Sequence, residues 1–105
     1  MVRIKKQCLF LVFLVDSPRD TELSPCGGVL AVDAEISVSS NSNPEISMYE
    51  WFINDTVVST DSVLVITEDM LGSDVQITCS VMNSMRNGDA IGMDNATCTY
   101  TILRK

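Results

Sequence analysis

Four cysteines are the residues of this chain with the most reactive side chains, and their spacing bears on metal and redox chemistry. They are Cys8, Cys26, Cys79 and Cys98, and the chain has no histidine. No two of them form a Cys-x-x-Cys pair, which argues against zinc, because a zinc site needs closely paired ligands. We therefore expect no bound metal, and we interpret Cys26, Cys79 and Cys98 as disulfide candidates if the chain is secreted.

The other residues give little support to catalysis. The chain has no histidine to act as a base, no Gly-x-Ser-x-Gly sequence and no phosphate-binding loop. Its acidic residues, among them Glu68, Asp69, Asp89 and Asp94, do not form the dense loop of oxygen ligands that calcium prefers. We expect a protein that is not an enzyme and binds no cofactor.

The charge of the chain bears on its partners. The net charge is −7, whereas binding to a phosphate backbone requires clustered lysine and arginine. We therefore expect no nucleic-acid partner.

Two tripeptides match the acceptor sequence for N-linked glycans. They begin at Asn54 and at Asn95, and each ends in a threonine. Both coincide with an expected turn or strand start, where a glycan could be accommodated. The alternative is ordinary turn chemistry, in which the asparagine stabilises a tight bend.

Residues 83–94 are expected to form a long loop that contains the turn pair Asn87-Gly88. The candidates for contact with a protein partner within it are Met85, Arg86, Asn87, Ile91 and Met93. Methionine side chains adapt to varied surfaces, which favours a contact role. In the alternative interpretation, these methionines fold back over the edge of the core.

Residues 1–15 combine a basic head with an unbroken apolar run from Cys8 to Val15. This layout is typical of a secretory signal, and a buried or edge strand is the alternative. These residues carry three of the seven basic side chains and none of the fourteen acidic ones, so the rest of the chain has a net charge of −10. No apolar run reaches the roughly 18 residues that a membrane helix needs, so we expect no integral membrane span.

The remaining chain divides into an expected linker, residues 16–28, and a β domain, residues 29–105. The linker is rich in Ser, Pro, Asp and Gly, which is typical of a loop. The domain consists of short alternating apolar segments separated by turn residues. We therefore expect an all-β fold, an antiparallel two-sheet sandwich of about seven strands. Its expected core residues are Ile36, Val38, Trp51, Leu64, Ile66, Ile77 and Tyr100.

Part of this domain resembles strands C, E and F of an immunoglobulin-like domain. The resemblance rests on Tyr49-x-Trp51-x-x-Asn54, then Leu64-x-Ile66, then Val75-x-Ile77-x-Cys79-x-Val81-x-Asn83. It implies that Trp51 is the core tryptophan of strand C and that Cys79 is the strand F cysteine. Two features depart from the usual pattern, because no cysteine lies near Val38 in strand B and Ile77 replaces the corner tyrosine. The chain is more similar to divergent immunoglobulin-like domains and to the repeats first described in the polycystic kidney disease protein.

Within such a sandwich the first strand runs close to the last, which favours a Cys26–Cys98 disulfide. Cys79–Cys98 and Cys26–Cys79 are the alternatives, and a free Cys79 would act as a small buried apolar residue.

The family implies a non-catalytic module for adhesion, recognition or spacing, at the cell surface or secreted, with neighbouring domains of the same kind. The alternatives are a structural repeat without a ligand and a small secreted inhibitor or effector that acts through residues 83–94.

Overall fold

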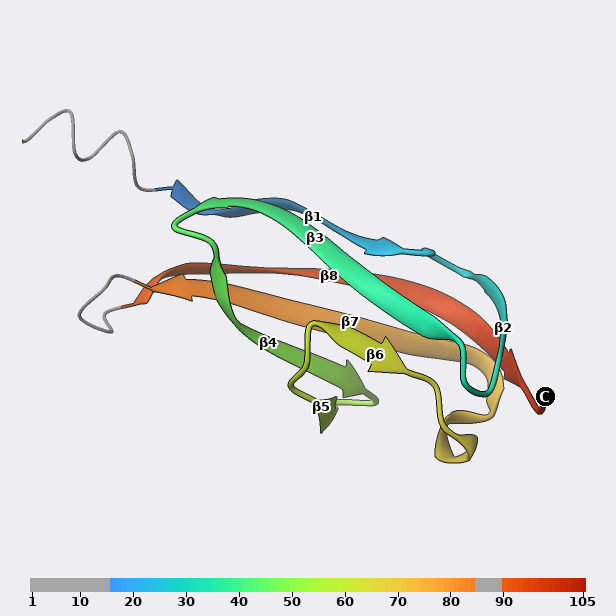
Figure 1. The fold of residues 1–105 in the computed structure, drawn as a ribbon. Coiled ribbons are helices and arrows are strands. Elements are labelled where there is room, and N and C mark those ends of the chain that lie inside the picture. Colours follow the sequence, from blue (N-terminus) through green and yellow to red (C-terminus); the bar gives the residue numbers. More distant parts are fainter. Residues whose placement is uncertain (1–15, 85–89) are drawn as a thin grey trace, which may run out of the picture.

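The computed structural model describes residues 16–84 and 90–105 (Figure 1). The expectations for residues 1–15, Met85, Arg86 and Asn87 therefore lie outside the described residues. Within them the chain forms eight β-strands and one short 3-10 helix. The strands belong to two sheets, so the expectation of an all-β protein with two sheets is confirmed.

The smaller sheet has three strands in the order β1-β3-β6, and both of its pairings are antiparallel. Its strands are β1 (Asp16–Ser24), β3 (Glu35–Asn43) and β6 (Val63–Val65). β1 follows β3 over most of its length, whereas β6 pairs only with residues 35–37. The rest of β3 therefore has a hydrogen-bonded neighbour on one side only.

The larger sheet has five strands in the order β2-β8-β7-β4-β5. Its strands are β2 (Gly28–Ala31), β4 (Ile46–Ile53), β5 (Thr56–Ser59), β7 (Gly72–Ser84) and β8 (Ala90–Leu103). β7 and β8 are the longest strands and run side by side along the sheet (Figure 1). The pair formed by β2 and β8 is parallel. The expectation of a purely antiparallel sandwich is therefore wrong at this pair, and the strands number eight rather than about seven.

The structure also corrects three predicted segments. Residues 16–24 form β1 where a linker was predicted, so the folded domain begins before Val29. β3 includes residues 39–43, a run of serine and asparagine that is typical of a loop, and ends at Asn43. β7 and β8 extend through most of the predicted loop 83–94, to Ser84 and from Ala90. In each segment, strand pairing compensates for a local sequence that is rich in polar residues.

The core lies between the two sheets and consists of inward-facing residues that alternate with exposed ones. Six of the seven expected core residues are fully buried: Ile36, Trp51, Leu64, Ile66, Ile77 and Tyr100. The seventh, Val38, is only half-buried and packs against the edge of this core. The core is completed by Leu23 of β1, by Cys79 and Val81 of β7, and by Cys98 and Ile102 of β8.

Two short connections match their expected chemistry. Asn54 and Asp55 both have positive φ, 52° and 65°, in the turn between β4 and β5. Asparagine and aspartate tolerate this left-handed conformation better than most residues, which suits a tight hairpin. The 3-10 helix η1 (Glu68–Met70) forms a single turn that ends before Gly72.

Candidate functional site

The sandwich is closed at one end by a disulfide between Cys26 and Cys98. Cys26 lies between β1 and β2, and Cys98 lies on the inner face of β8. The bond therefore fastens the point where the chain crosses from the smaller sheet to the larger one. This is the pairing that the sequence favoured over its two alternatives, and it is confirmed.

Cys79 is the third cysteine within the described residues, and it is fully buried with a free thiol. Burial raises the pKa of this thiol from its ordinary value near 9 to about 12. Because the thiolate is the nucleophile, a cysteine with this pKa is inert at neutral pH. Cys79 therefore acts as a small core residue opposite Ala96 of β8.

Both candidate glycosylation residues are exposed. Asn54 lies in the turn between β4 and β5, and Asn95 lies on β8 among outward-facing residues. These positions leave both side chains accessible from solvent, so the prediction of glycosylation at either stays open.

The expected contact loop is largely a continuation of the β7–β8 hairpin. Of its described candidates, Ile91 is half-buried and Met93 is 60% exposed. Asn83, at the other end of the predicted loop, is fully buried. Its side-chain amide donates hydrogen bonds to the carbonyl oxygens of Asp16, at 2.7 Å, and Pro44, at 3.1 Å. Asn83 therefore holds β1 and the β3–β4 turn against β7 and belongs to the framework.

A row of three methionines crosses the outer face of the larger sheet. Met48 of β4 lies opposite Met82 of β7, which in turn lies opposite Met93 of β8. Met48 is 49% exposed and Met82 is half-buried. The alternation of residues in the sequence shows that each methionine faces outward on its strand. It does not show the register of the three strands, which aligns the methionines. This methionine row is an apolar feature that sequence analysis missed.

The acidic residues are dispersed. Within residues 16–84 and 90–105, no group of three or more His, Cys, Asp or Glu residues could hold a metal ion. Asp94 instead accepts a hydrogen bond of 2.7 Å from the hydroxyl of Thr21, and this bond lowers the pKa of its carboxyl group. Glu68 pairs with Arg104, and Asp33 pairs with Lys105, both at the surface. The same part of the chain contains no helix long and apolar enough to cross a membrane.

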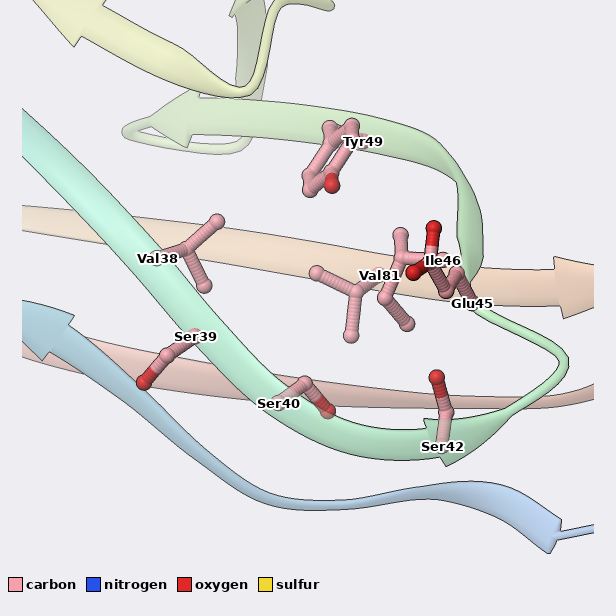
Figure 2. A pocket seen from close by; sticks show the side chains of 8 residues that line it. All are labelled: Val38, Ser39, Ser40, Ser42, Glu45, Ile46, Tyr49 and Val81. Carbon is pink, nitrogen blue, oxygen red and sulfur yellow. The ribbon is translucent and has the colours of Figure 1, made fainter.

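A cavity of about 300 Å³ opens between the sheets beside the unpaired part of β3 (Figure 2). Its apolar residues come from three strands, and its polar residues are mainly the serines of β3 with one carboxylate. The lining residues are Val38, Ser39, Ser40, Ser42, Glu45, Ile46, Tyr49 and Val81. Small-molecule and peptide sites commonly combine such an apolar lining with a few polar groups. We refer to this feature as the β3–β4 cavity.

Comparisons with protein-family models and with curated proteins find no match for this chain.

Proposed function

We propose that this chain is an extracellular immunoglobulin-like module that recognises a protein partner and has no catalytic activity of its own. The observation that carries this proposal is the order of strands in the two sheets. β1, β3 and β6 correspond in order to strands A, B and E of an immunoglobulin-like sandwich. β8, β7, β4 and β5 correspond to strands G, F, C and C′. On this assignment Trp51 lies on strand C and Cys79 on strand F, as the resemblance implies.

The disulfide supports an extracellular location. Disulfides persist in oxidising compartments and are rare in the cytosol. The bond joins Cys26 to Cys98, whereas antibody domains join strands B and F. Ile36 occupies the core on β3, and Cys79 has no cysteine partner. In this proposal the module is a divergent member of the fold, in which a bond from the β1–β2 connection to β8 replaces the bond between strands B and F.

Uncovered apolar surface favours recognition over a purely structural repeat. Met48 and Met93 of the methionine row are exposed, and the β3–β4 cavity opens at the surface. Methionine-rich surfaces suit contact with a partner because their side chains adapt in shape. A spacer between neighbouring domains of the same kind would need neither feature.

Secretion of the full chain from eukaryotic cells tests this proposal. We expect the protein in the medium with Cys26 and Cys98 joined, and with glycan on Asn54 or Asn95. Peptide mapping by mass spectrometry without reduction detects the disulfide and any residue removed from the N-terminus. The matched variants Asn54→Gln and Asn95→Gln identify which asparagine carries glycan. Retention of the chain inside the cell with Cys26 and Cys98 as free thiols would contradict the proposal.

A further inference from the structure

Among the described residues, β3 has no hydrogen-bonded neighbour on its β6 side over residues 38–43, which are six of its nine residues. β6 pairs with Glu35, Ile36 and Ser37, and its pairing ends there. Residues 38–43 pair with β1 on the opposite edge, but within the described residues no strand pairs with them on the β6 side. Every second residue of a strand directs its N–H and C=O groups to the same edge. Residues 38–43 therefore present about three such pairs of groups at the open edge.

This edge lacks the charged side chains and the proline by which many proteins prevent unwanted strand pairing. Natural edges are protected by charged side chains, by proline within the strand or by very short strands. Residues 38–43 read Val-Ser-Ser-Asn-Ser-Asn, without a charge or a proline. The chain can therefore accept another strand here at no cost in buried charge.

The β3–β4 cavity reaches this same edge. Ser39 and Ser40 both line it, although successive residues of a strand point to opposite faces. The cavity therefore borders β3 along residues 38–42, within the part of the strand that β6 leaves unpaired. Figure 2 shows the labelled residues of β3 and β4 around the opening, with Val38, Ile46 and Val81 as its apolar part. A volume of about 300 Å³ has room for one or two side chains.

The charge at the opening favours a basic group. Glu45 lies exposed in the β3–β4 turn and lines the cavity. Neither of the two ion pairs within the described residues includes it. The net charge of −10 outside residues 1–15 also attracts basic partners to the protein as a whole.

We propose that the open edge of β3 binds an extended peptide segment of a partner protein by strand addition. The peptide pairs with residues 38–43 and places one apolar side chain in the β3–β4 cavity and one lysine or arginine beside Glu45. Main-chain hydrogen bonds supply affinity in this mode of recognition, and the pocket supplies specificity. This inference rests on the proposed recognition function and identifies its surface and its kind of partner.

The test uses peptides selected from a phage-displayed library of random 12-residue sequences, with the full chain as the target. We expect the enriched peptides to carry an apolar residue close to a lysine or arginine. Synthetic copies of them should slow hydrogen exchange of the amides in residues 38–43 that point away from β1. Exchange at residues 35–37 should stay unchanged, because these residues already pair with β6. Failure to enrich any peptide, or protection confined to another strand, would overturn the proposal.

Two variants and two matched controls locate the binding site. Ser42→Phe fills the cavity and should weaken the Kd about tenfold. Glu45→Arg reverses its charge and should weaken the Kd about fivefold. Glu35→Arg makes the same charge change on the part of β3 that β6 covers. Ser73→Phe adds the same ring at an exposed position near the start of β7. This position is distant from the cavity, which β7 reaches only near its other end, at Val81. Circular dichroism establishes that all four variants fold. If both cavity variants bind the peptide with the same Kd as their controls, the proposal is wrong.

Two other occupants are separate outcomes of the same measurements. If, in the peptide-free full chain, the amides of residues 38–43 that point away from β1 are already protected from exchange and the chain sediments as a dimer, a second copy occupies the edge. If these amides are protected but the chain sediments as a monomer, another part of the same chain occupies the edge. Either result overturns strand addition by a partner. The secretion experiment is independent of both, so its failure would refute the extracellular module without deciding whether the edge binds peptides.

Discussion

The hydroxyl group of Tyr100 donates a hydrogen bond of 2.6 Å to the carbonyl oxygen of Pro25. Tyr100 is a buried residue of β8, and Pro25 directly precedes the disulfide-bonded Cys26. The hydrogen bond from Tyr100 and the disulfide from Cys98 therefore hold the same segment, which crosses from one sheet to the other. Both residues face inward on β8. At this crossing the chain leaves the smaller sheet after β1 and enters the larger sheet as β2.

Removal of this hydroxyl should destabilise the fold modestly. We expect Tyr100→Phe to lower the free energy of unfolding by about 1 kcal/mol, because one hydrogen bond is lost while the ring stays packed. Urea unfolding measures the change. Tyr49→Phe is the matched control, since the Tyr49 hydroxyl forms no side-chain hydrogen bond among the described residues and should give no comparable loss. Equal effects of the two changes would show that the bond to Pro25 contributes nothing.

Loss of the disulfide should cost considerably more. The two cysteines are 72 residues apart, and in the chain-entropy model a closed loop of this length contributes about 4 kcal/mol. We expect the double variant Cys26→Ser/Cys98→Ser to lose stability of this order in urea unfolding. Dithiothreitol should destabilise the unaltered protein similarly and leave the double variant unaffected. An unchanged midpoint in the double variant would contradict this prediction.

The buried thiol of Cys79 should resist modification and make stability depend on alkaline pH. Its pKa is about 12 in the folded protein and near 9 when exposed. Above pH 9, unfolding therefore releases the proton of this thiol. The contribution of the neutral thiol to the free energy of unfolding is complete below pH 9 and declines between pH 9 and 12. The stability advantage of the unaltered protein over Cys79→Ala should shrink over this range. Rapid reaction of Cys79 with iodoacetamide at about pH 8 in the native state would contradict its burial.

The hydrogen bond between Thr21 and Asp94 should make the stability of the fold depend on pH in the acidic range. The Thr21 hydroxyl lowers the pKa of Asp94 below its unfolded value. The stabilising effect is therefore present above the unfolded pKa and is lost as the pH falls through the folded one. NMR titration should show a higher Asp94 pKa in Thr21→Val. Thr97→Val, which removes a hydroxyl bonded to Thr78 instead, should leave it unchanged.

Close approach of β1 to β8 should make Gly92 intolerant of a side chain. A Cβ atom at Gly92 would lie 2.5 Å from the hydroxyl oxygen of Ser17 and 2.8 Å from its Cβ. We expect Gly92→Ala to lower the free energy of unfolding by about 1–3 kcal/mol, as overpacking does. The same change in a Ser17→Gly background should cost clearly less, because the clashing atoms are absent. Equal costs in both backgrounds in a double-mutant cycle would rule out this contact as the cause.

The sequence alone identified which residues face inward on the central strands. Trp51, Ile77 and Tyr100 each lie within a run of alternating apolar and polar residues, and each is buried. Alternation is a local property, because successive side chains of a strand point to opposite faces whatever the strand pairs with. The same rule predicted that Cys98 faces inward. Its pairing with Cys26 was favoured by the resemblance to immunoglobulin-like sandwiches, in which the first strand runs close to the last.

The pairing of strands was decided by the tertiary structure. Residues 16–24 have only two buried side chains, Pro18 and Leu23, and become a strand because β3 supplies hydrogen-bonding partners along their length. The methionine row depends on the register of three strands, and the open edge of β3 depends on where β6 ends. Neither register nor the extent of a pairing is encoded in one strand, since both result from contacts between segments distant in sequence. The candidate site therefore became visible only in the folded protein, although the core that supports it was predictable from the sequence.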